Sequence, residues 1–399
     1  SGKSMADVVI LGAGYAGIRA VKTLSKLAPK GTTLTVVDQN ANHEERTQLH
    51  EVAAGTVPAT KITFNIQQVL PKDVQFIQSK VSKVDVSSKL VVLENHAPLR
   101  YDYLIIALGF RSEDFGLPGA AENALPLDNV TSAETIAKTI EQRVANYKQS
   151  QDPKDLTVIV AGAGFTGVEL LGELTHSLPA LAKKYDTPPV KIISMEMATR
   201  ILPMFDEKLA NYAMDYLKSH GVTMMTGSKI TKIEPNAVVY ADGDQEKKVE
   251  GNTIIWTVGV SGSDVIADSG FNQRRNRVVV SNHLNLTDHP EVFIIGDVSA
   301  VMTDAGRPYP TTAQISSQEG DHAGKNVAAA LNGQPLTDFV YKSKGTVASL
   351  GSQDGIAQIG KSHKYTGFIA KVLKRVITDK SLLEDANLST MLKQGRWPL

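Results

Sequence analysis

The sequence of 399 residues contains no cysteine. This absence excludes disulfide bonds, thiolate metal sites, iron–sulfur clusters and every mechanism that depends on a cysteine nucleophile or a redox-active cysteine pair. An excess of charge of one sign is also missing, since 42 basic residues balance 42 acidic residues and neither sign forms a block. A nucleic-acid partner is therefore not expected.

Long hydrophobic runs are missing as well. No apolar run approaches the roughly 18 residues of a membrane-spanning helix, and the N-terminal residues lack the charged and then apolar pattern of a signal peptide. We therefore expect a protein that folds in the cytosol. Its length predicts two or three domains, because domains usually contain about 100–200 residues.

Glycine follows a defined pattern near the N-terminus. The β-branched run VVILGAG is followed by apolar residues at helical spacing and then by TLTVVD at residues 33–38, which predicts a βαβ unit. Gly12, Gly14 and Gly17 have the spacing G-x-G-x-x-G at its first turn. These glycines permit a tight turn, the approach of a pyrophosphate and close packing of the helix. Asp38 ends the second strand, where a carboxylate can bind ribose hydroxyls, so the unit predicts a dinucleotide site.

A second unit of this kind begins about 150 residues later, which is too long a period for a solenoid. Gly162, Gly164 and Gly167 repeat the glycine pattern, and Glu196 takes the place of the acid. A carboxylate there favours NADH over NADPH, because it disfavours a 2′-phosphate. Arg200 lies shortly after it and leaves NADPH as an alternative. One chain with two such sites can hold two different dinucleotides and pass electrons between them.

Four segments in chain order carry a family resemblance: VVILGAGYAG, VIVAGAGFTGVE, LIIALG and FIIGDVSA. They resemble the two-dinucleotide-binding flavoprotein oxidoreductases, in which the first loop holds FAD and the second holds the nicotinamide dinucleotide. The acid of the GD pair, here Asp297, binds the flavin ribityl chain in that superfamily. More narrowly, RPYPTTAQISSQEG at residues 307–320, GAGFTGVELLGEL, and GTVASLG at residues 345–351 resemble type II NADH dehydrogenase, a single-subunit NADH:quinone oxidoreductase. The resemblance extends from Val8 to about Ile377.

The resemblance implies an α/β fold of two Rossmann-like dinucleotide-binding domains and a C-terminal segment with an amphipathic helix. A polar, proline-bearing segment at residues 150–156 indicates a boundary before the second unit, and a looser boundary lies near residues 262–272. We predict a FAD domain at residues 5–152 and 266–335, an NADH domain inserted at residues 153–265, and a C-terminal domain with a membrane-association helix at residues 336–399.

The absence of cysteine narrows the choice within this superfamily. Enzymes that resemble glutathione reductase need a redox cysteine pair, sulfide:quinone reductases need cysteines, and peroxide-forming or water-forming relatives commonly use one. What remains is a flavoprotein that passes electrons from a nicotinamide through FAD to an external acceptor.

Three residues are predicted to be catalytic. Glu169 matches a glutamate that in type II NADH dehydrogenases lies near flavin and nicotinamide and is implicated in catalysis, for example in proton supply to quinone. Its alternative role is that of an acid stabilising the first turn of a helix. Gln314 and Gln318 match glutamines that in the family lie beside the flavin and near the quinone pocket. Two amides at i and i+4 share a helix face and can donate to a quinone carbonyl, or can instead bridge buried backbone.

Residues 40–56 resemble the family's flavin-adjacent segment, although Asn42 replaces the usual aromatic residue. His43 and His50 in this segment are expected to be ordinary structural histidines, because no carboxylate or thiolate set joins them in a metal site. The predicted FAD-binding residues are Gly12, Ala13, Gly14, Tyr15, Ala16, Gly17, Asp38, Gln39, Thr47, Val81, Gly109, Asp297, Ala313, Gln314 and Lys374. The predicted NADH-binding residues are Gly162, Gly164, Phe165, Gly167, Glu196 and Gly259.

Near the C-terminus, apolar residues recur on one face of a predicted helix, with Lys371, Lys374 and Arg375 between them. The apolar residues are Phe368, Ile369, Val372, Leu373, Val376 and Ile377. This pattern suits an interfacial membrane helix whose cations reach the lipid headgroups, or a surface helix packed on the core. Family members dock on the membrane through such helices, and their counterpart of Lys374 approaches the flavin. Glu384 and Asp385 depart from the family's uncharged stretch and make burial in lipid costlier.

We predict a FAD-dependent NADH:quinone oxidoreductase that reduces a quinone of the menaquinone or ubiquinone type by two electrons without pumping protons. It is expected to be a homodimer attached peripherally to the cytoplasmic side of the cell membrane. One alternative is a soluble cytoplasmic NADH-dependent reductase for a ferredoxin-like protein or oxygen, and another is a flavin-bearing redox sensor. The AQISSQ stretch argues against the soluble reductase, and the acidic interruption near Glu384 argues for it.

Overall fold

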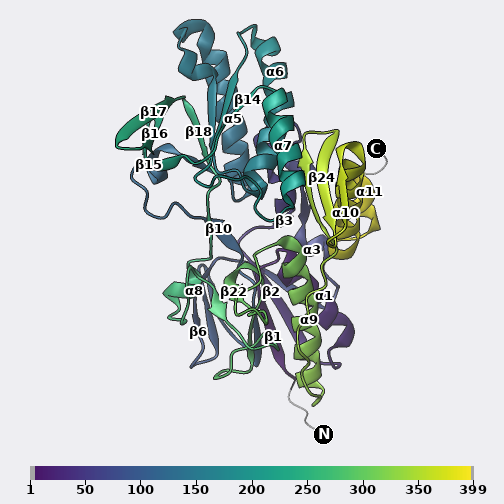
Figure 1. Cartoon of the computed structure of the whole chain (residues 1–399). Helices are drawn as coiled ribbons and strands as arrows, with labels where there is room; N and C mark the ends of the chain where they lie inside the picture. The colour runs from purple at the N-terminus through teal and green to yellow at the C-terminus, as the bar shows by residue number, and fades with distance from the viewer. Residues whose placement is uncertain (1–4, 397–399) are drawn as a thin grey trace.

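The computed structural model describes residues 5–396, so the last three residues of the predicted C-terminal domain lie outside it. Figure 1 shows two large domains, each built around a parallel sheet, and a smaller C-terminal domain beside them. The predicted α/β fold with two Rossmann-like domains is confirmed.

The first domain contains a five-stranded parallel sheet in the order β21-β9-β1-β2-β5. Its strands are β1 (Asp7–Leu11), β2 (Thr33–Asp38), β5 (Val74–Gln78), β9 (Tyr103–Ile106) and β21 (Val292–Ile294). Helices α1 (Tyr15–Leu27) and α9 (Ala313–Leu331) lie side by side against this sheet (Figure 1). They approach so closely that a Cβ atom at Gly320 would overlap the carbonyl oxygen of Ala16.

The second domain repeats this plan with the sheet order β11-β18-β12-β13-β14. Its strands are β11 (Leu125–Pro126), β12 (Thr157–Ala161), β13 (Lys191–Met195), β14 (Val222–Met225) and β18 (Thr253–Trp256), and its helices include α5 (Val130–Ser150), α6 (Phe165–Tyr185) and α7 (Glu207–Ser219). Each domain also carries a three-stranded antiparallel sheet. These sheets are β6 (Val81–Asp85), β7 (Leu90–Leu93) and β8 (His96–Arg100) in the first domain, and β15 (Lys229–Glu234), β16 (Ala237–Asp242) and β17 (Gln245–Glu250) in the second.

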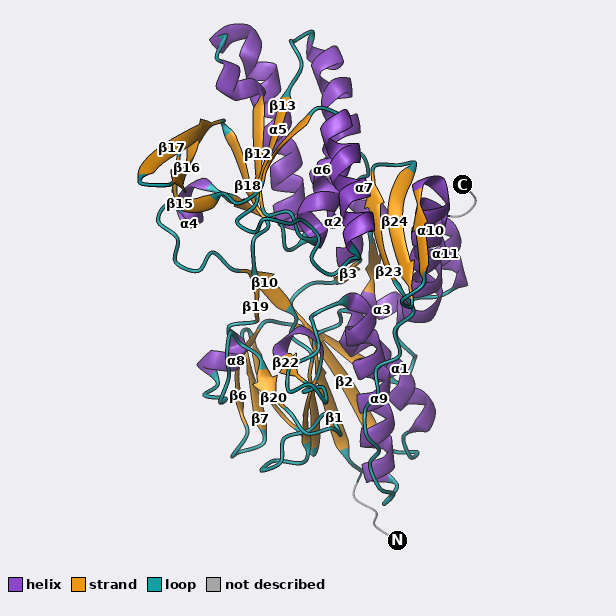
Figure 2. Ribbon diagram, viewed as in Figure 1, coloured by secondary structure: helices purple, strands orange, loops and turns teal. Residues whose placement is uncertain are grey.

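The predicted boundary at residue 152 lies too far along the chain. Strand β11 pairs with β18 of the second sheet, and α5 packs against α6, so both belong to the second domain. The polar, proline-bearing segment marks only the end of α5 and a short 3₁₀ helix at Pro153–Leu156. The chain crosses between the domains through β10 (Phe110–Ser112) and β19 (Val260–Gly262), which pair with each other (Figure 2).

The C-terminal domain consists of a three-stranded antiparallel sheet and two helices. Its elements are β23 (Thr346–Leu350), β24 (Asp354–Ile359), β25 (His363–Thr366), α10 (Gly367–Asp385) and α11 (Leu388–Gln394). Helix α10 packs on β23 and β24, while β23 contacts α6 of the second domain. A Cβ atom at Gly172 of α6 would lie 2.8 Å from the backbone nitrogen of Gly351, so glycine permits this close contact.

Short elements complete the chain around the three domains. They are β3 (Asn42–Glu44), α2 (Leu49–Ala53), β4 (Thr63–Asn65), α3 (Ile66–Val69), α4 (Ala120–Asn123), α8 (Val265–Asp268), β20 (Val278–Val279) and β22 (Ser299–Ala300). Of these, α2 contacts both α5 and α6, which places the segment after β3 where the domains meet.

Candidate active site

The first glycine loop joins β1 to α1. Gly12 has a φ of +100°, and a Cβ atom there would overlap the carbonyl oxygen of Ala107 on the neighbouring chain segment. A Cβ atom at Gly14 would meet no other atom within 4 Å, so this face of the loop is open to a ligand. Gly14 also caps α1 without a side-chain hydrogen bond, which leaves the N–H groups of the first turn for an anion.

Asp38 shapes this loop from the end of β2. Its two carboxylate oxygens accept hydrogen bonds from the backbone nitrogens of Ala13 and Asn40, both at 2.8 Å. Burial raises the pKa of Asp38, and these two hydrogen bonds partly oppose that effect. The carboxylate therefore holds the glycine loop in place as well as facing the cavity beside it.

A cavity of about 820 Å³ extends from this loop between the three domains. All but one of the predicted FAD-binding residues line it, namely Gly12, Ala13, Gly14, Tyr15, Ala16, Asp38, Gln39, Thr47, Val81, Gly109, Asp297, Ala313, Gln314 and Lys374. Gly17 lies behind the lining, where a Cβ atom would overlap the carbonyl oxygen of Gly12. The structure thus brings together residues from both parts of the first domain and from α10.

Asp297 provides a test of whether this cavity fits FAD. Burial raises its pKa to about 6, with Arg46 and Arg277 partly opposing the rise. Within residues 5–396, no hydrogen bond satisfies its carboxylate, although it lines the cavity. A half-buried acceptor of this kind suits a hydroxylated chain, while the open glycine loop suits a pyrophosphate. The residues present therefore fit FAD.

The second glycine loop has the same design as the first. Gly162 has a φ of +102°, and a Cβ atom there would lie 2.6 Å from Oγ1 of Thr257. Gly164 is open in the same way as Gly14. Glu196 accepts hydrogen bonds from the backbone nitrogens of Ala163 at 2.8 Å and Ala198 at 2.9 Å.

The two sites meet at the beginning of α6. Gly162, Gly164, Gly167 and Glu196 do not line the cavity, but Phe165 and Gly259 of the predicted NADH set do. Arg200, which could have favoured a 2′-phosphate, donates to the carbonyl oxygen of Phe205 instead. The second loop therefore opens outside the cavity, and the helix that follows it leads into the cavity.

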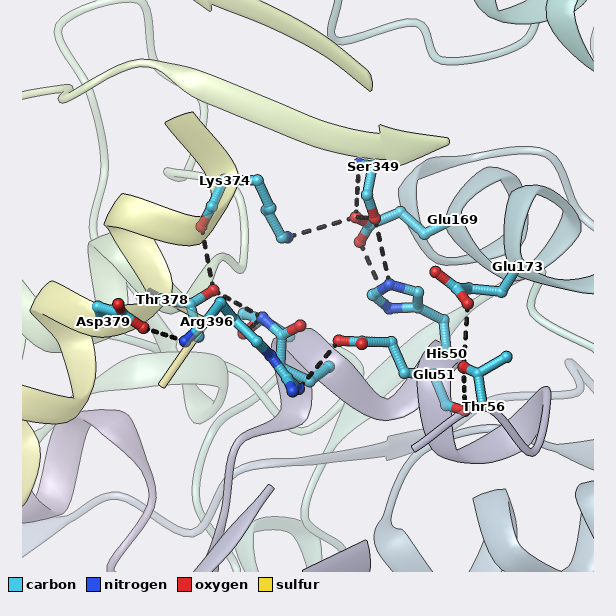
Figure 3. Close-up of polar contacts among 12 residues, drawn as sticks. His50, Glu51, Thr56, Glu169, Glu173, Ser349, Lys374, Thr378, Asp379 and Arg396 are labelled. Atoms are coloured by element: carbon cyan, nitrogen blue, oxygen red, sulfur yellow. Dashed lines mark hydrogen bonds and ion pairs between the residues drawn. The ribbon is translucent and has the colours of Figure 1, made fainter. Parts of the chain in front are cut away.

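Glu169 lies at the centre of a buried polar cluster (Figure 3). Its Oε2 atom accepts hydrogen bonds from the backbone nitrogen of Ser349 at 2.9 Å and from Oγ of Ser349 at 2.8 Å. Nζ of Lys374 lies 3.3 Å from the same oxygen, and Nδ1 of His50 lies 3.9 Å from Oε1. Burial raises the pKa of Glu169, but Lys374, His50 and the two hydrogen bonds outweigh it and hold the pKa below its ordinary value.

This arrangement corrects one expectation. Glu169 lies beyond the first turn of α6, so the alternative of a first-turn stabilising acid is wrong. His50 is buried, contacts the cluster and lines the cavity, and its expected structural role stays a prediction. His43 fits the structural expectation, since Nδ1 lies 2.7 Å from the carbonyl oxygen of Ala13 and its ring stacks on Phe64.

Ser349 is the member of this cluster that sequence reasoning missed. It lies in the GTVASLG segment, whose resemblance identified the family but no role for this serine. The only available signal was a small polar residue inside an otherwise apolar strand. In the structure its side chain is fully buried and faces Glu169.

The two glutamines on α9 hold a neighbouring segment of backbone. Gln314 donates to the carbonyl oxygen of Gly345 at 3.1 Å and accepts from the hydroxyl of Tyr341 at 2.7 Å. Gln318 donates to the carbonyl oxygen of Lys342 at 2.8 Å and accepts from its backbone nitrogen. Gln314 lines the cavity, whereas Gln318 does not. The alternative in which these amides bridge backbone describes the contacts, and direct donation to a quinone stays a prediction.

The charged residues of α10 lie on both faces: Lys371, Lys374, Asp379 and Asp385 are buried, whereas Lys380 is exposed. Lys371 and Lys374 are buried, so the expectation that they reach the lipid headgroups is wrong. Asp385 is 1% exposed and accepts a hydrogen bond from Ser381, while Glu384 pairs with Arg19 of α1 at 2.8 Å. Nη1 of Arg19 also lies 4.0 Å from Oδ1 of Asp385, so both carboxylates face the first domain.

Comparisons with known proteins show which families and structures this chain is similar to. The sequence pattern of the pyridine nucleotide-disulphide oxidoreductase family matches residues 6–320. A protein of Staphylococcus haemolyticus named type II NADH:quinone oxidoreductase is 40% identical over 397 residues, covering 98% of each chain. A protein of the same name from Staphylococcus aureus is 38% identical over 399 residues, also covering 98% of each chain.

Two solved structures share the fold at low sequence identity. NDH2 from Plasmodium falciparum, determined in complex with NADH, superimposes with a TM-score of 0.87 at 17% identity and covers 98% of both chains. The sulfide:quinone oxidoreductase of Aquifex aeolicus superimposes with a TM-score of 0.79 at 19% identity, covering 96% of this chain and 92% of its own.

Proposed function

The chain belongs to the pyridine nucleotide-disulphide oxidoreductase family, among the type II NADH:quinone oxidoreductases, and we propose that its two glycine loops hold the two cofactors of one reaction. The enzyme takes hydride from NADH and reduces a quinone by two electrons, without proton pumping. FAD, when bound, supplies the redox chemistry between the two substrates. In this proposal FAD occupies the cavity that begins at Gly12, and NADH binds at Gly162.

The observation that carries this assignment is the course of α6. The helix begins at the second glycine loop, and Phe165, Thr166 and Glu169 then line the cavity that begins at the first loop. A dinucleotide bound at the start of α6 can therefore extend its reactive ring into the cavity. Holding two reactants in this way supplies much of the rate enhancement in hydride transfer.

The cofactor loops bind by backbone donors rather than by charged side chains. The first turns of α1 and α6 direct N–H groups and the positive end of the helix dipole at the phosphates. Asp297 would accept a hydrogen bond from the hydroxylated chain of FAD, and Glu196 would disfavour a 2′-phosphate at the second site. The ion pair of Glu169 with Lys374 fixes both side chains beside the reacting groups.

Quinone approaches from the side of α10 in this proposal. Ile377 lines the cavity and is also 42% exposed on the surface, so the cavity reaches the outside along this helix. An apolar side chain at that opening suits the ring of a menaquinone or ubiquinone. Gln314 and Lys374 line the same region of the cavity and can donate hydrogen bonds to a quinone carbonyl.

The opening lies on an apolar face of the C-terminal domain, which we assign to peripheral membrane attachment. Exposed apolar side chains on α10 and α11 are Phe368, Ile369, Val376, Ile377, Leu383, Leu388 and Leu392. Exposed lysines flank them at Lys361, Lys380 and Lys393. No helix of the described residues is long and apolar enough to cross a membrane. An apolar face with cations at its margin suits an anionic lipid surface on the cytoplasmic side, and a homodimer remains a prediction.

The acidic interruption near Glu384 no longer favours the alternative of a soluble reductase. The acidic interruption at Glu384 and Asp385 argued against lipid contact, but both carboxylates pair with Arg19 of the first domain. The exposed face of α10 is mainly apolar, with Lys380 as a cation on it.

Anaerobic half-reactions test the proposal. Purified protein mixed with NADH should bleach its visible flavin absorption, and a menaquinone or ubiquinone analogue added afterwards should restore it. The variant Ile369→Glu places a charge on the exposed face and should weaken binding to anionic vesicles without altering the half-reaction with NADH. Bleaching that quinone cannot reverse would contradict the proposal and support the soluble reductase or the sensor.

A further inference from the structure

The hydroxyl of Ser349 connects two titratable groups of the active site. Ser349 is 0% exposed on β23 and does not line the cavity, so it cannot contact a substrate. Its Oγ atom lies 2.8 Å from Oε2 of Glu169 and 3.2 Å from Nε2 of His50. A hydroxyl can donate one hydrogen bond while it accepts another. Ser349 can therefore donate to Glu169 and accept from His50 at the same time.

The carboxylate of Glu169 is bound unevenly. Oε2 receives both hydrogen bonds from Ser349 and the ion pair with Lys374. Oε1 has no hydrogen bond from the part of the chain that the structure describes, and Nδ1 of His50 lies 3.9 Å from it. A proton that moves from the serine hydroxyl therefore arrives at Oε2, while Oε1 remains available to a group in the cavity.

The reaction needs a proton in this buried place. NADH gives up two electrons and one proton as a hydride, whereas the quinone takes up two electrons and two protons. The medium must supply the second proton for every quinone that is reduced. Glu169 and His50 both line the cavity and are both at least nine-tenths buried, so a proton can reach the quinone only through such groups or through ordered water.

We propose that Ser349 is a positioning residue that passes this proton between His50 and Glu169. His50 donates from Nε2 to the serine oxygen, and the serine hydrogen moves to Glu169, so one proton is transferred and the serine is regenerated. This inference rests on the proposed function, because it concerns the proton demand of quinone reduction. It assigns to the hydroxyl a role that the backbone nitrogen of Ser349 cannot perform.

The other charged groups around Glu169 set the conditions for this transfer. Lys374 and Lys371 face it from α10, Glu173 lies one turn further along α6, and Glu51 follows His50 on α2. Lys371 is buried among the carboxylates of Glu51, Glu169 and Glu173, and burial lowers the pKa of this lysine. When a proton moves between His50 and Glu169, these neighbouring charges compensate the change in charge. The cluster can therefore hold a proton without exposure to bulk water.

The test separates the two half-reactions by stopped-flow absorbance. Ser349→Ala keeps the backbone hydrogen bond to Glu169 but removes the relay. We expect bleaching by NADH within about twofold of wild type, and quinone-driven reoxidation slowed about tenfold with a larger solvent deuterium isotope effect. Ser349→Thr keeps a hydroxyl and should restore the rate and the isotope effect. Ser194→Ala is the matched control, because Ser194 is equally buried and its hydroxyl has no hydrogen-bond partner among the described residues.

A second variant keeps the inference testable if Ser349→Ala does not retain FAD. His50→Gln preserves a donor but cannot pass a proton on, so it should slow the quinone half-reaction and enlarge its solvent deuterium isotope effect. Equal losses in both half-reactions, or a quinone half-reaction with wild-type rate and isotope effect in these variants, would overturn the relay. Wild-type protein whose flavin is not reoxidised by quinone would instead overturn the proposed function.

Discussion

The two glycine loops have the same backbone design but different surroundings. In both loops the first glycine has a φ near +100°, and a carboxylate from the neighbouring strand accepts two backbone hydrogen bonds. The first loop opens into a cavity enclosed by three domains, whereas the glycines of the second loop lie outside that cavity. The comparison indicates that what covers the βαβ unit, and not the unit itself, decides whether a dinucleotide is retained or exchanged.

Replacement of the first glycine of each loop by alanine should have the largest effect and should separate the two sites. The new Cβ atom at Gly12 would overlap a backbone carbonyl oxygen, while the one at Gly162 would first meet the side-chain hydroxyl of Thr257. We expect Gly12→Ala to lower the free energy of unfolding by about 3 kcal/mol and to yield protein without FAD. Gly162→Ala should keep FAD and raise the KM for NADH. Flavin absorbance per protein and steady-state kinetics measure both effects, and loss of FAD from both variants would contradict the assignment of the loops.

Glu169 lies where the two sites meet, so its replacement should affect the two half-reactions differently. Glu169→Gln removes the charge beside Lys374 and leaves a buried cation unpaired. We expect quinone reduction to fall about 100-fold, a typical loss for a group that transfers protons, with a smaller effect on bleaching by NADH. Glu141→Gln is the control, because Glu141 forms an exposed ion pair with Lys184. Unchanged quinone turnover across pH would show that Glu169 has no catalytic role.

Asp38 and Glu196, the acids at the strand ends, should have different effects on the two cofactors when they are replaced. Glu196→Ala removes the acceptor for Ala163 and Ala198 and the group that disfavours a 2′-phosphate. We expect the preference for NADH over NADPH, measured as a ratio of kcat/KM values, to fall about tenfold. Asp38→Ala should lower retention of FAD and leave that ratio unchanged. A change in nucleotide preference in the Asp38 variant would mean that the two loops had been assigned to the wrong cofactors.

The stability of the contact between α10 and the first domain should depend on pH, because Asp385 of α10 faces Arg19. Burial raises the pKa of Asp385 to about 7 from an ordinary value of 3.8, with Glu45 adding to the rise. Because the fold favours the protonated form, the stability from this group is fully present below about pH 4 and is lost as the pH rises through about 7. Asp385→Asn should therefore stabilise the protein by on the order of 1–3 kcal/mol at pH 8 and have little effect at pH 4. Urea unfolding at both pH values, with FAD release recorded, measures this difference.

Local sequence patterns were sufficient to predict both βαβ units. The glycine spacing, the acid at the strand end and the strands themselves are encoded within a few tens of residues, and the structure has them where the pattern placed them. The cluster around Glu169 could not be predicted in this way, because His50 and Ser349 lie far away in the sequence. His50 meets Glu169 through packing of α2 on α6, and Ser349 through packing of β23 on α6.

The C-terminal helix shows the same limit. Its apolar periodicity predicted a helix with distinct faces, but periodicity does not identify the face that packs inward. The inner face contains Lys371 and Lys374, since the carboxylates of α6 and α2 compensate their charges. The predicted boundary at residue 152 failed for a related reason, since β11 is too short to be recognised without its partner β18.

The position of Lys374 on α10 has a consequence for biosynthesis. A chain grows from its N-terminus, so both glycine loops and the first sheet strands are made well before α10. The cavity obtains Lys374 and Ile377 only when α10 is in place. Until then the chain lacks the cation beside Glu169. The synthesis of α10 thus sets the earliest point at which the cavity is complete.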